Sequence, residues 1–353
     1  MDASPWSGRR VFLTGHTGFK GSWLALRLAR AGAAVYGYAL APDTEPNLFE
    51  AARVGDVLAG STIADLRDRD VLVKAMRRTD PEIVLHLAAQ PLVRRSYREP
   101  LATWDVNVMG TVAVLESARA CPQLAGIVAV TTDKVYAHGA APHPFAESDA
   151  LGGYDPYSAS KAASELAASS YRDAFLRERG IAVATARAGN VIGGGDWAEE
   201  RLFPDVVRAA FEHRPLAIRY PDAIRPWQHV LDAIDGYVRL GERMLAGGGD
   251  AVARAWNFGP DPRDVASVRD VVAAASDALG VPSAFDGAPA EFVEAATLTL
   301  DSREARARLG WSSRLRMAEA VAWTASWYRN YYDGGDAAAT SLEQIAAYED
   351  LAA

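Results

Sequence analysis

The stretch Val11-Phe12-Leu13-Thr14-Gly15-His16-Thr17-Gly18-Phe19-Lys20-Gly21 decides the fold of this chain. A short apolar run comes first, three glycines spaced by three follow, and a helical pattern with Trp23, Leu24 and Leu28 comes next. Three glycines alone are a weak signal, but a strand before them and a helix after them indicate a dinucleotide-binding loop. The glycines permit a tight turn and close approach of the backbone to a pyrophosphate, and the helix N-terminus attracts its negative charge. The cofactor-binding candidates in this loop are Gly15, Thr17, Gly18, Phe19 and Gly21.

Strand-like and helix-like stretches alternate beyond this loop. Strands are predicted at 34–40, 83–87, 126–131 and 181–187, and helices at 68–78, 103–120 and 158–179. This alternation predicts an α/β fold, a Rossmann-type doubly wound parallel sheet covered on both faces. After Asn190 the rhythm breaks, a further strand at 256–259 returns to the sheet, and helices are predicted at 268–279 and 318–331. We therefore expect an NAD-binding domain at 1–187 with return segments at about 225–262, an interleaved substrate domain at 188–335 and a C-terminal extension at 336–353.

The composition excludes several classes of protein. The 353 residues are 50% hydrophobic and 23% charged, which is typical of a folded globular chain. The formal net charge of −8 argues against nucleic-acid or membrane-surface binding. The single cysteine, Cys121, excludes an intramolecular disulfide and a Cys-His metal cluster, so no metal is expected. No apolar run approaches the ~20 residues of a membrane span, and the sequence predicts a cytoplasmic location.

Lysine is rare in this chain, which has 33 arginines and only four lysines. A position that stays lysine where arginine is otherwise preferred indicates a need for an amine, because only lysine is readily tuned in pKa. Lys74 is expected to be an ordinary surface charge, and Lys20 to lie in the glycine loop with a solvent-facing side chain as the alternative. Lys161 follows Tyr157 by four residues, so both lie on one face of a helix.

Several motifs together resemble the extended short-chain dehydrogenase/reductase family. The glycine loop and Tyr157-Ser158-Ala159-Ser160-Lys161 match its cofactor loop and its Tyr-Lys pair, and Thr131-Thr132 stands where the family keeps a substrate-binding hydroxyl. Thr132-Asp133-Lys134 is similar to the Thr-Asp-Lys of the CDP-glucose 4,6-dehydratases, where other sugar-nucleotide dehydratases read Thr-Asp-Glu. The competing interpretations are that Tyr157 and Lys161 have this spacing by chance on a helix, and that Asp133 and Lys134 are an ordinary solvated pair in a loop. The resemblance implies the catalytic residues Thr132, Asp133, Lys134, Tyr157 and Lys161.

The resemblance also implies how ligands are held. It assigns the cofactor positions Asp65, Leu66, Leu87, Ala88 and Ala89, with Tyr157 and Lys161 shared between cofactor binding and catalysis. The second strand ends without the acid that usually marks NAD and without a cation for a 2′-phosphate, and NAD is favoured over NADP. Asn190, Arg201 and Arg225 are the candidates for the substrate, a nucleoside-diphosphate sugar, because arginine suits phosphate. Relatives pair through two helices, which implies a homodimer through 103–120 and 158–179.

The implied reaction removes water from a nucleotide sugar, most simply CDP-glucose. Tyr157 takes the 4-hydroxyl proton while NAD accepts the C4 hydride, Lys134 takes or relays the C5 proton, and Asp133 protonates the departing 6-hydroxyl. Lys134 is either the base or the residue that orients a water. The stretch 137–144, with His138 and His143 as expected loop residues, departs from the family and leaves the nucleotide and sugar open. A 4-epimerase or reductase of the same fold and a dinucleotide-sensing regulatory protein are the alternatives.

Overall fold

A computed structural model describes residues 4–137, 143–214, 216–218, 220–261, 264–281, 285–287 and 297–351. Within these residues, seven strands form one parallel sheet in the order β11-β6-β5-β4-β1-β2-β3. The strands are β1 (Arg10–Thr14), β2 (Ala34–Ala39), β3 (Gly60–Ile63), β4 (Ile83–His86), β5 (Gly126–Val130), β6 (Ala182–Ala188) and β11 (Ala255–Phe258). The predicted α/β class and doubly wound parallel sheet are confirmed.

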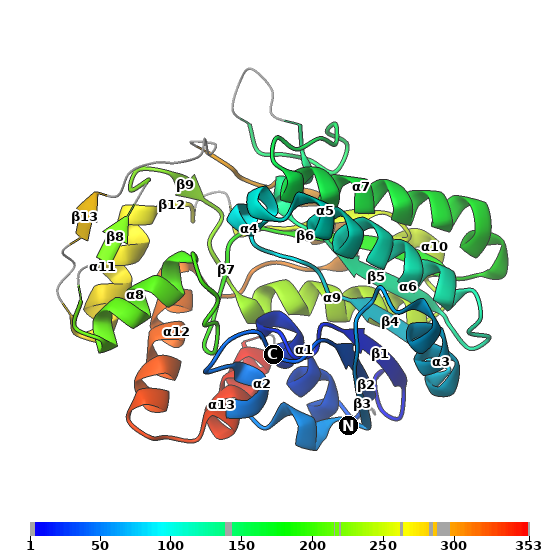
Figure 1. The fold of residues 1–353 in the computed structure, drawn as a ribbon, viewed down its shortest axis with the longest axis horizontal. Helices are drawn as coiled ribbons and strands as arrows, with labels where there is room; N and C mark the ends of the chain where they lie inside the picture. The colour runs from blue at the N-terminus through cyan, green and yellow to red at the C-terminus, as the bar shows by residue number, and fades with distance from the viewer. Residues whose placement is uncertain are drawn as a thin grey trace.

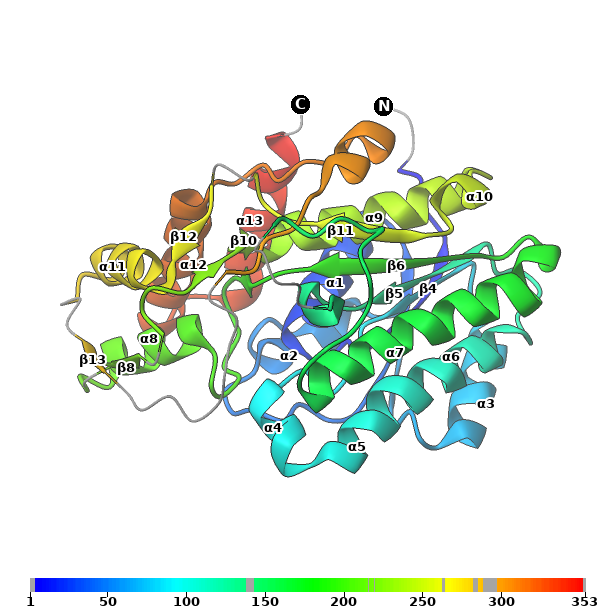
Figure 2. The ribbon, with the colours of Figure 1, turned by 90° about the horizontal axis from the view of Figure 1, so that it is seen from above.

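Helices cover both faces of this sheet (Figures 1 and 2). One face carries α3 (Arg69–Thr79), α5 (Pro100–Trp104), α6 (Gly110–Ala118) and α7 (Pro156–Tyr171), and the other carries α1 (Phe19–Arg30) and α9 (Val230–Leu245). The inner strands β4, β5 and β6 are buried along their whole length, as strands covered on two faces must be. The short helices α2 (Leu48–Ala51), α4 (Val93–Arg98) and α10 (Gly249–Val252) lie in the connections.

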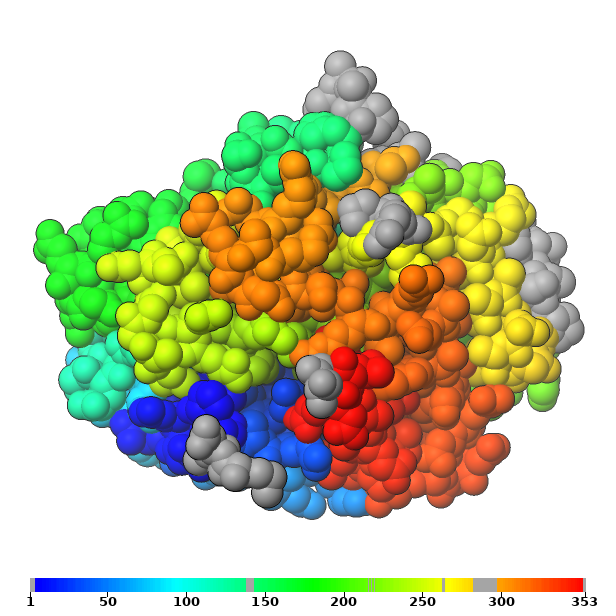
Figure 3. Space-filling model, turned by 180° about the vertical axis from the view of Figure 1, so that it is seen from behind, coloured from blue at the N-terminus to red at the C-terminus, as the bar shows by residue number. Residues whose placement is uncertain are grey.

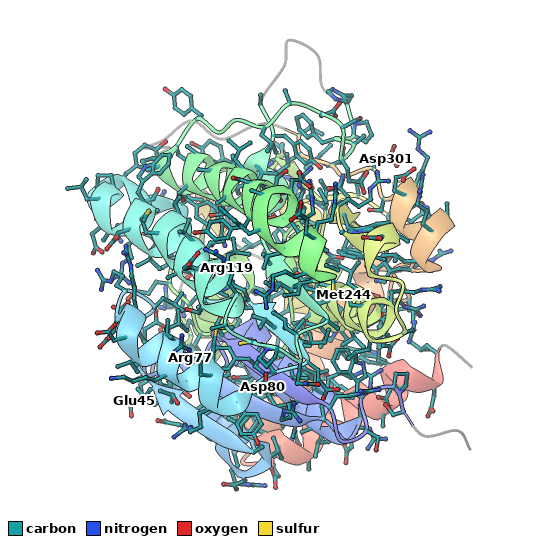
Figure 4. All side chains as sticks on the ribbon, turned by 90° about the vertical axis from the view of Figure 1, so that its right-hand side faces the viewer. Glu45, Arg77, Asp80, Arg119, Met244 and Asp301 are labelled. Carbon is teal, nitrogen blue, oxygen red and sulfur yellow. The ribbon has the colours of Figure 1, made fainter. Side chains whose placement is uncertain are left out.

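The strand order reverses between β1 and β4, and this is the point at which ligands bind in open α/β sheets. The glycine loop follows β1 and the 87–89 stretch follows β4, so both meet at the carboxyl edge there. Figure 4 shows the opposite edge of the molecule, where the ends of helices carry Arg77, Asp80, Arg119 and Met244. The Met244 thioether packs on Gly126 at the amino end of β5, so this edge is filled by side chains.

A second group of elements, here called the cap, projects beyond the carboxyl edge of the sheet (Figure 1). The cap consists of α8 (Leu202–Phe211), β8 (Leu216–Ile218), α11 (Val268–Leu279) and β13 (Phe285–Gly287). Short strand pairs connect it to the sheet, namely β7 (Val191–Ile192) with β10 (Gln228–His229) and β9 (Ile224–Arg225) with β12 (Ala266–Ser267). The domain boundaries at 187, at 225–262 and at 335 stay predictions.

The C-terminal helices fasten the cap to the sheet domain. α12 (Met317–Tyr332) packs on α11, and α13 (Ala337–Asp350) packs on both α12 and α1. Figure 3 shows α13, in red, beside the blue N-terminal segment, and Glu349 pairs with Arg27 and Arg30 of α1. In the part of the chain that the structure describes, no helix is long and apolar enough to cross a membrane.

Two of the predicted helices differ in detail from the observed ones. The helix predicted at 103–120 is divided by a wider π turn at Asp105–Met109 between α5 and α6. The helix predicted at 158–179 begins two residues earlier, because Asp155 caps it through the Ser158 amide and Pro156 suits the first turn. Its last residues, 172–179, leave the α-helical path.

Candidate active site

A cavity of about 290 Å³ lies between the carboxyl edge of the sheet and the cap. Residues from both parts line it. The sequence-predicted residues among them are Thr132, Asp133, Lys134, Tyr157, Asn190, Arg201 and Arg225. The structure therefore brings all but one of the predicted catalytic residues, and all three predicted substrate residues, to one cavity. The exception, Lys161, lies one helical turn behind Tyr157 on α7.

Tyr157 and Lys161 are both buried on the face of α7 that lies against β5. The Tyr157 side chain is 8% exposed, and burial raises the pKa of its phenol to about 12, while a hydrogen bond with Thr132 acts in the opposite direction. The Lys161 ammonium donates to the Val130 carbonyl at 3.2 Å, and burial lowers its pKa to about 8. The phenol thus needs added positive charge before it can act as a base near neutral pH.

A buried asparagine that the sequence reading missed holds this helix in place. Asn107 Nδ2 donates to Ser160 Oγ at 2.9 Å and to the Gln90 carbonyl at 3.1 Å. Its own carbonyl accepts from Ser164 Oγ at 2.8 Å. In the sequence, Asn107 could have been noticed as an amide side chain with apolar neighbours in the middle of the helix predicted at 103–120.

Asp133 is the most deeply buried acid of the cavity, with 2% of its surface exposed. One carboxyl oxygen accepts from Thr132 Oγ1 at 3.0 Å, and the other, Oδ2, has no hydrogen-bond partner among the described residues. Burial raises the pKa of Asp133, against the opposing effects of Lys134, Thr132, Arg225 and Lys20. The carboxyl therefore keeps its proton to a higher pH than an exposed aspartate does, as a general acid requires. Lys134 is half-buried beside it.

Lys20 lines the same cavity, which decides between its two interpretations. It occupies the first turn of α1, and burial lowers the pKa of its ammonium to about 8, with Arg201 and Lys161 acting in the same direction and Asp133 against it. Its side chain belongs to the site and does not simply extend into solvent. The scarcity of lysine was the signal that pointed to it.

The predicted anion-binding residues sit at three places on the cavity wall. Arg225 is buried on β9, where its guanidinium donates to the Ile224 carbonyl at 2.9 Å. Arg201 precedes α8 and pairs with Asp196 at 3.1 Å. The Asn190 carbonyl accepts from the Gln228 amide at 3.0 Å, which fixes the loop after β6. Two of the three side chains, Arg201 and Arg225, carry a positive charge that suits an anionic ligand, although the chain has a net negative charge.

The glycine loop forms a cradle that fits a dinucleotide pyrophosphate. Gly15 has φ +78°, and a β-carbon on it would lie 2.8 Å from the Ala88 nitrogen. A β-carbon on Gly21 would lie 2.0 Å from the Gly15 carbonyl oxygen, whereas one on exposed Gly18 would meet nothing closer than 3.5 Å. The loop is therefore closed on the protein side and open where a ligand's phosphates would approach the first turn of α1.

The other predicted cofactor positions gather around this loop. Thr14 Oγ1 accepts from the Leu87 and Ala88 amides at 3.1 Å, which holds the 87–89 stretch, with Ala89, at the end of β1. Thr17 donates to the Leu40 carbonyl at 2.8 Å, and half-buried Phe19 packs on Gly193. Leu66 is buried, and the Asp65 carboxylate accepts from Arg67, which lowers the pKa of Asp65.

A buried ion pair that the sequence reading missed supports the strands behind the site. Arg187 at the end of β6 donates to both carboxylate oxygens of Glu165 on α7 at 2.9 Å. The same carboxylate accepts from Thr131 at 2.6 Å and from Thr185 at 2.5 Å. Four donors thus tie α7, β5 and β6 together directly beneath the cavity-lining residue Thr131.

Two further expectations concern metals and the 137–144 loop, whose sequence departs from that of the family. His143 is exposed, as expected of a loop residue, and its Nε2 lies 2.9 Å from Asp149 Oδ2. His138 lies outside the described residues, together with the rest of the 138–142 part of this loop. Among the described residues, no three His, Cys, Asp or Glu side chains are placed to hold a metal ion.

Comparisons with known proteins agree with this geometry. The family model for GDP-mannose 4,6 dehydratase matches residues 12–324. A CDP-glucose 4,6-dehydratase of Salmonella typhimurium is 41% identical over 99% of this chain and 98% of its own length. A UDP-glucose 4-epimerase of Mycolicibacterium smegmatis is 31% identical over 91% of this chain and 99% of its own. A crystal structure of a dTDP-glucose 4,6-dehydratase from Streptomyces venezuelae with NAD and TYD bound superimposes with a TM-score of 0.79 at 25% identity, covering 93% of this chain and 99% of the other.

Proposed function

Because the chain belongs to the GDP-mannose 4,6-dehydratase family, within the extended short-chain dehydrogenases/reductases, we propose that it is an NAD-dependent 4,6-dehydratase that converts CDP-glucose to CDP-4-keto-6-deoxyglucose. The convergence of Asp133, Lys134 and Tyr157 on one cavity supports this function above all. A 4-epimerase needs the threonine, Tyr157, Lys161 and the cofactor, but it needs neither Asp133 nor Lys134. The 41% identity to a CDP-glucose enzyme supports the choice of nucleotide.

Tyr157 acts first, as the base that takes the proton of the sugar 4-hydroxyl. Its pKa of about 12 must fall for this role, and the ammonium of Lys161 and the positive charge of the oxidised nicotinamide both stabilise a phenolate. Bound NAD would supply the hydride acceptor for C4 and later the hydride donor for C6. Thr132 interacts with both Tyr157 and Asp133 and so holds these two reacting groups at fixed positions relative to each other.

Asp133 and Lys134 carry out the elimination. A 4-ketone acidifies the C5 hydrogen, Lys134 takes this proton directly or through a water, and the 6-hydroxyl leaves as water with the proton of Asp133. Burial already raises the pKa of Asp133, which favours the protonated state that this step needs. The proton that Tyr157 takes from the 4-hydroxyl balances the proton that Asp133 gives to the departing hydroxyl. C5 regains a proton when the hydride returns to C6, so the net reaction is loss of water.

The remaining predicted residues hold the two ligands. Gly15, Thr17, Gly18, Phe19 and Gly21 cradle the NAD pyrophosphate, and Asp65, Leu66, Leu87, Ala88 and Ala89 border the rest of the cofactor. Asn190, Arg201 and Arg225 bind the substrate diphosphate, and the two arginines supply positive charge opposite its negative charges. The preference for NAD over NADP and the cytoplasmic location stay predictions.

We also propose that the protein is a homodimer joined through α5, α6 and α7. Large apolar side chains stand exposed on this face, among them Leu101 at 86% and Leu166 at 62%, together with Trp104, Met109 and Phe175. Several exposed apolar side chains on neighbouring helices of one face support a partner surface there. Light scattering of the wild type at micromolar concentration should give twice the chain mass, and a Leu166→Glu variant should give one chain mass. A monomeric wild type would overturn the proposal.

The function is tested by incubating the NAD-loaded protein with CDP-glucose. We expect the alkali-induced ultraviolet absorbance of a 4-keto-6-deoxy product, and a Tyr157→Phe variant should lower kcat by about 10²- to 10⁴-fold, as loss of a general base does. Formation of a 4-epimer without the keto product would instead assign an epimerase. Unchanged turnover in Tyr157→Phe would remove the catalytic role of this residue.

A further inference from the structure

An acidic residue joins the cap to the sheet domain beside the cavity. Glu200 lies in the loop just before α8, and its Oε1 is 3.8 Å from Arg94 Nη1 and 3.5 Å from Arg98 Nη1. Both arginines belong to α4, which packs on α5 and α7 of the sheet domain. Figures 1 and 2 show α4 at the end of the sheet domain that faces the cap. One carboxylate thus bridges the two parts of the molecule.

This bridge lies at the wall of the active-site cavity. Glu200 and Arg94 line the cavity, whereas Arg98 is not among the described residues that do. The side chain of Glu200 is 26% exposed and that of Arg94 is 20% exposed, while that of Arg98 is 60% exposed. The bridge therefore extends from the cavity wall to the protein surface. A movement of the cap away from α4 would have to break it.

The loop that carries Glu200 is held on both sides of this residue. Asp196 accepts from the Ala198 amide at 3.1 Å through Oδ1 and pairs with Arg201 at 3.1 Å through Oδ2. Glu200 itself has φ +60°, in the left-handed region that residues other than glycine rarely adopt. Backbone strain of this kind persists only where the surroundings impose it. The loop thus presents the Glu200 carboxylate to α4 in a fixed conformation.

The proposed reaction gives such a bridge a purpose. The sugar is oxidised at C4 in the first step, and the cofactor is returned to its oxidised form only in the last. If the 4-keto sugar left the cavity in between, the hydride would stay on the cofactor and the proton of the 4-hydroxyl on Tyr157, so the protein would be left in a reduced form. A closed site commits the bound substrate to the whole sequence of steps.

We propose that Glu200, Arg94 and Arg98 form a latch that holds the cap closed against the sheet domain while the nucleotide sugar is oxidised, dehydrated and reduced. This inference rests on the proposed function and adds to it how the intermediate is retained. Arg98 is a positioning residue in this latch, because it acts on the ligand only through Glu200.

The test compares Arg98→Gln and Glu200→Gln with wild type in the NAD-loaded protein. The measurements are calorimetry of CDP binding, the KM and kcat for CDP-glucose, and the near-ultraviolet absorbance of reduced cofactor that builds up during turnover. Each variant should weaken CDP binding and raise KM by about three- to tenfold, with kcat changed by less than about twofold, because half-exposed ion pairs are weak and act on binding rather than chemistry. Reduced cofactor should build up several times faster than in wild type. Adding Arg98→Gln to Glu200→Gln should have no further effect, since the two residues act through one contact.

Arg95→Gln is the matched control, because Arg95 is an exposed arginine of the same helix that pairs with Glu99 at 3.0 Å within the sheet domain. It should behave as wild type. The alternative is that Glu200 only repels the diphosphate and that the arginines compensate for its charge. That alternative predicts tighter CDP binding in Glu200→Gln, whereas the latch predicts weaker binding.

Two results would overturn the latch. One is CDP binding that is tighter in Glu200→Gln, and the other is unchanged binding and an unchanged build-up of reduced cofactor in both variants. A wild type that does not turn over CDP-glucose would instead overturn the proposed function. The latch would then be judged by CDP binding, which needs no turnover and which both variants should still weaken.

Discussion

The buried pair of Glu165 and Arg187 should contribute strongly to stability, because breaking it leaves a charge in the protein interior. Both side chains are under 5% exposed, and the Glu165 carboxylate accepts from four donors. Replacing it in Glu165→Gln leaves the Arg187 guanidinium buried without its counter-ion. Removal of one partner from such a pair costs about 3–5 kcal/mol of unfolding free energy.

Arg187 has other contacts, which set the upper limit of this cost. Its Nη1 donates to Tyr136 Oη at 2.8 Å, and the guanidinium lies 4.9 Å from the centre of the Tyr136 ring. The phenol is neutral and cannot replace the carboxylate.

Arg187→Met should be destabilising by a similar amount, since it leaves the Glu165 charge with only hydroxyl donors. The double variant should lose less than the sum of the two single losses by about 2–3 kcal/mol, because no uncompensated charge then remains.

The assay is urea unfolding followed by tryptophan fluorescence, for which the chain has nine tryptophans. The shift in midpoint multiplied by the urea dependence gives the change in unfolding free energy. Glu116→Gln is the control, because Glu116 forms an exposed pair with Arg119, and such pairs contribute about 0–1 kcal/mol. A loss below about 1 kcal/mol in Glu165→Gln, or strictly additive losses in the double variant, would refute this reasoning.

Three further predictions concern the site itself. Asp133→Asn should lower kcat by about 10²- to 10⁴-fold while the C4 oxidation still proceeds, so that bound reduced cofactor accumulates and is seen by its fluorescence. Because burial raises the pKa of Asp133, the wild-type kcat should decline as pH rises through that raised pKa and should show no decline between pH 7 and 5 from this group. Lys20 lowers the pKa of Asp133, so Lys20→Met should move the alkaline decline to higher pH and Lys20→Arg should not; identical pH profiles would contradict this. Gly21→Ala places a β-carbon 2.0 Å from the Gly15 carbonyl oxygen and should abolish NAD retention in the purified protein, whereas Gly55→Ala, whose nearest neighbour is 3.6 Å away, should retain it.

Most of the fold could be predicted because its signals are local. The glycine loop, the buried strands and the helix at Val268–Leu279 follow from runs of a few adjacent residues, and the last of these was located to the residue. The π turn at Asp105–Met109 could not be predicted, since it depends on how Asn107 reaches Gln90 and Ser160, which are distant in the sequence. The Glu165–Arg187 pair is hidden for the same reason, as its members stand 22 residues apart on different elements.

The sequence by itself determined the cofactor cradle and the Tyr157–Lys161 pair, because a loop of glycines and an i, i+4 spacing need no distant partner to be recognised. Only the tertiary structure decided the surroundings of the catalytic groups. Burial raises the pKa of Asp133, and Lys20 lines the same cavity. Desolvation and electrostatic contacts act through space between segments far apart in the chain, so they exist only once the cap has packed against the sheet.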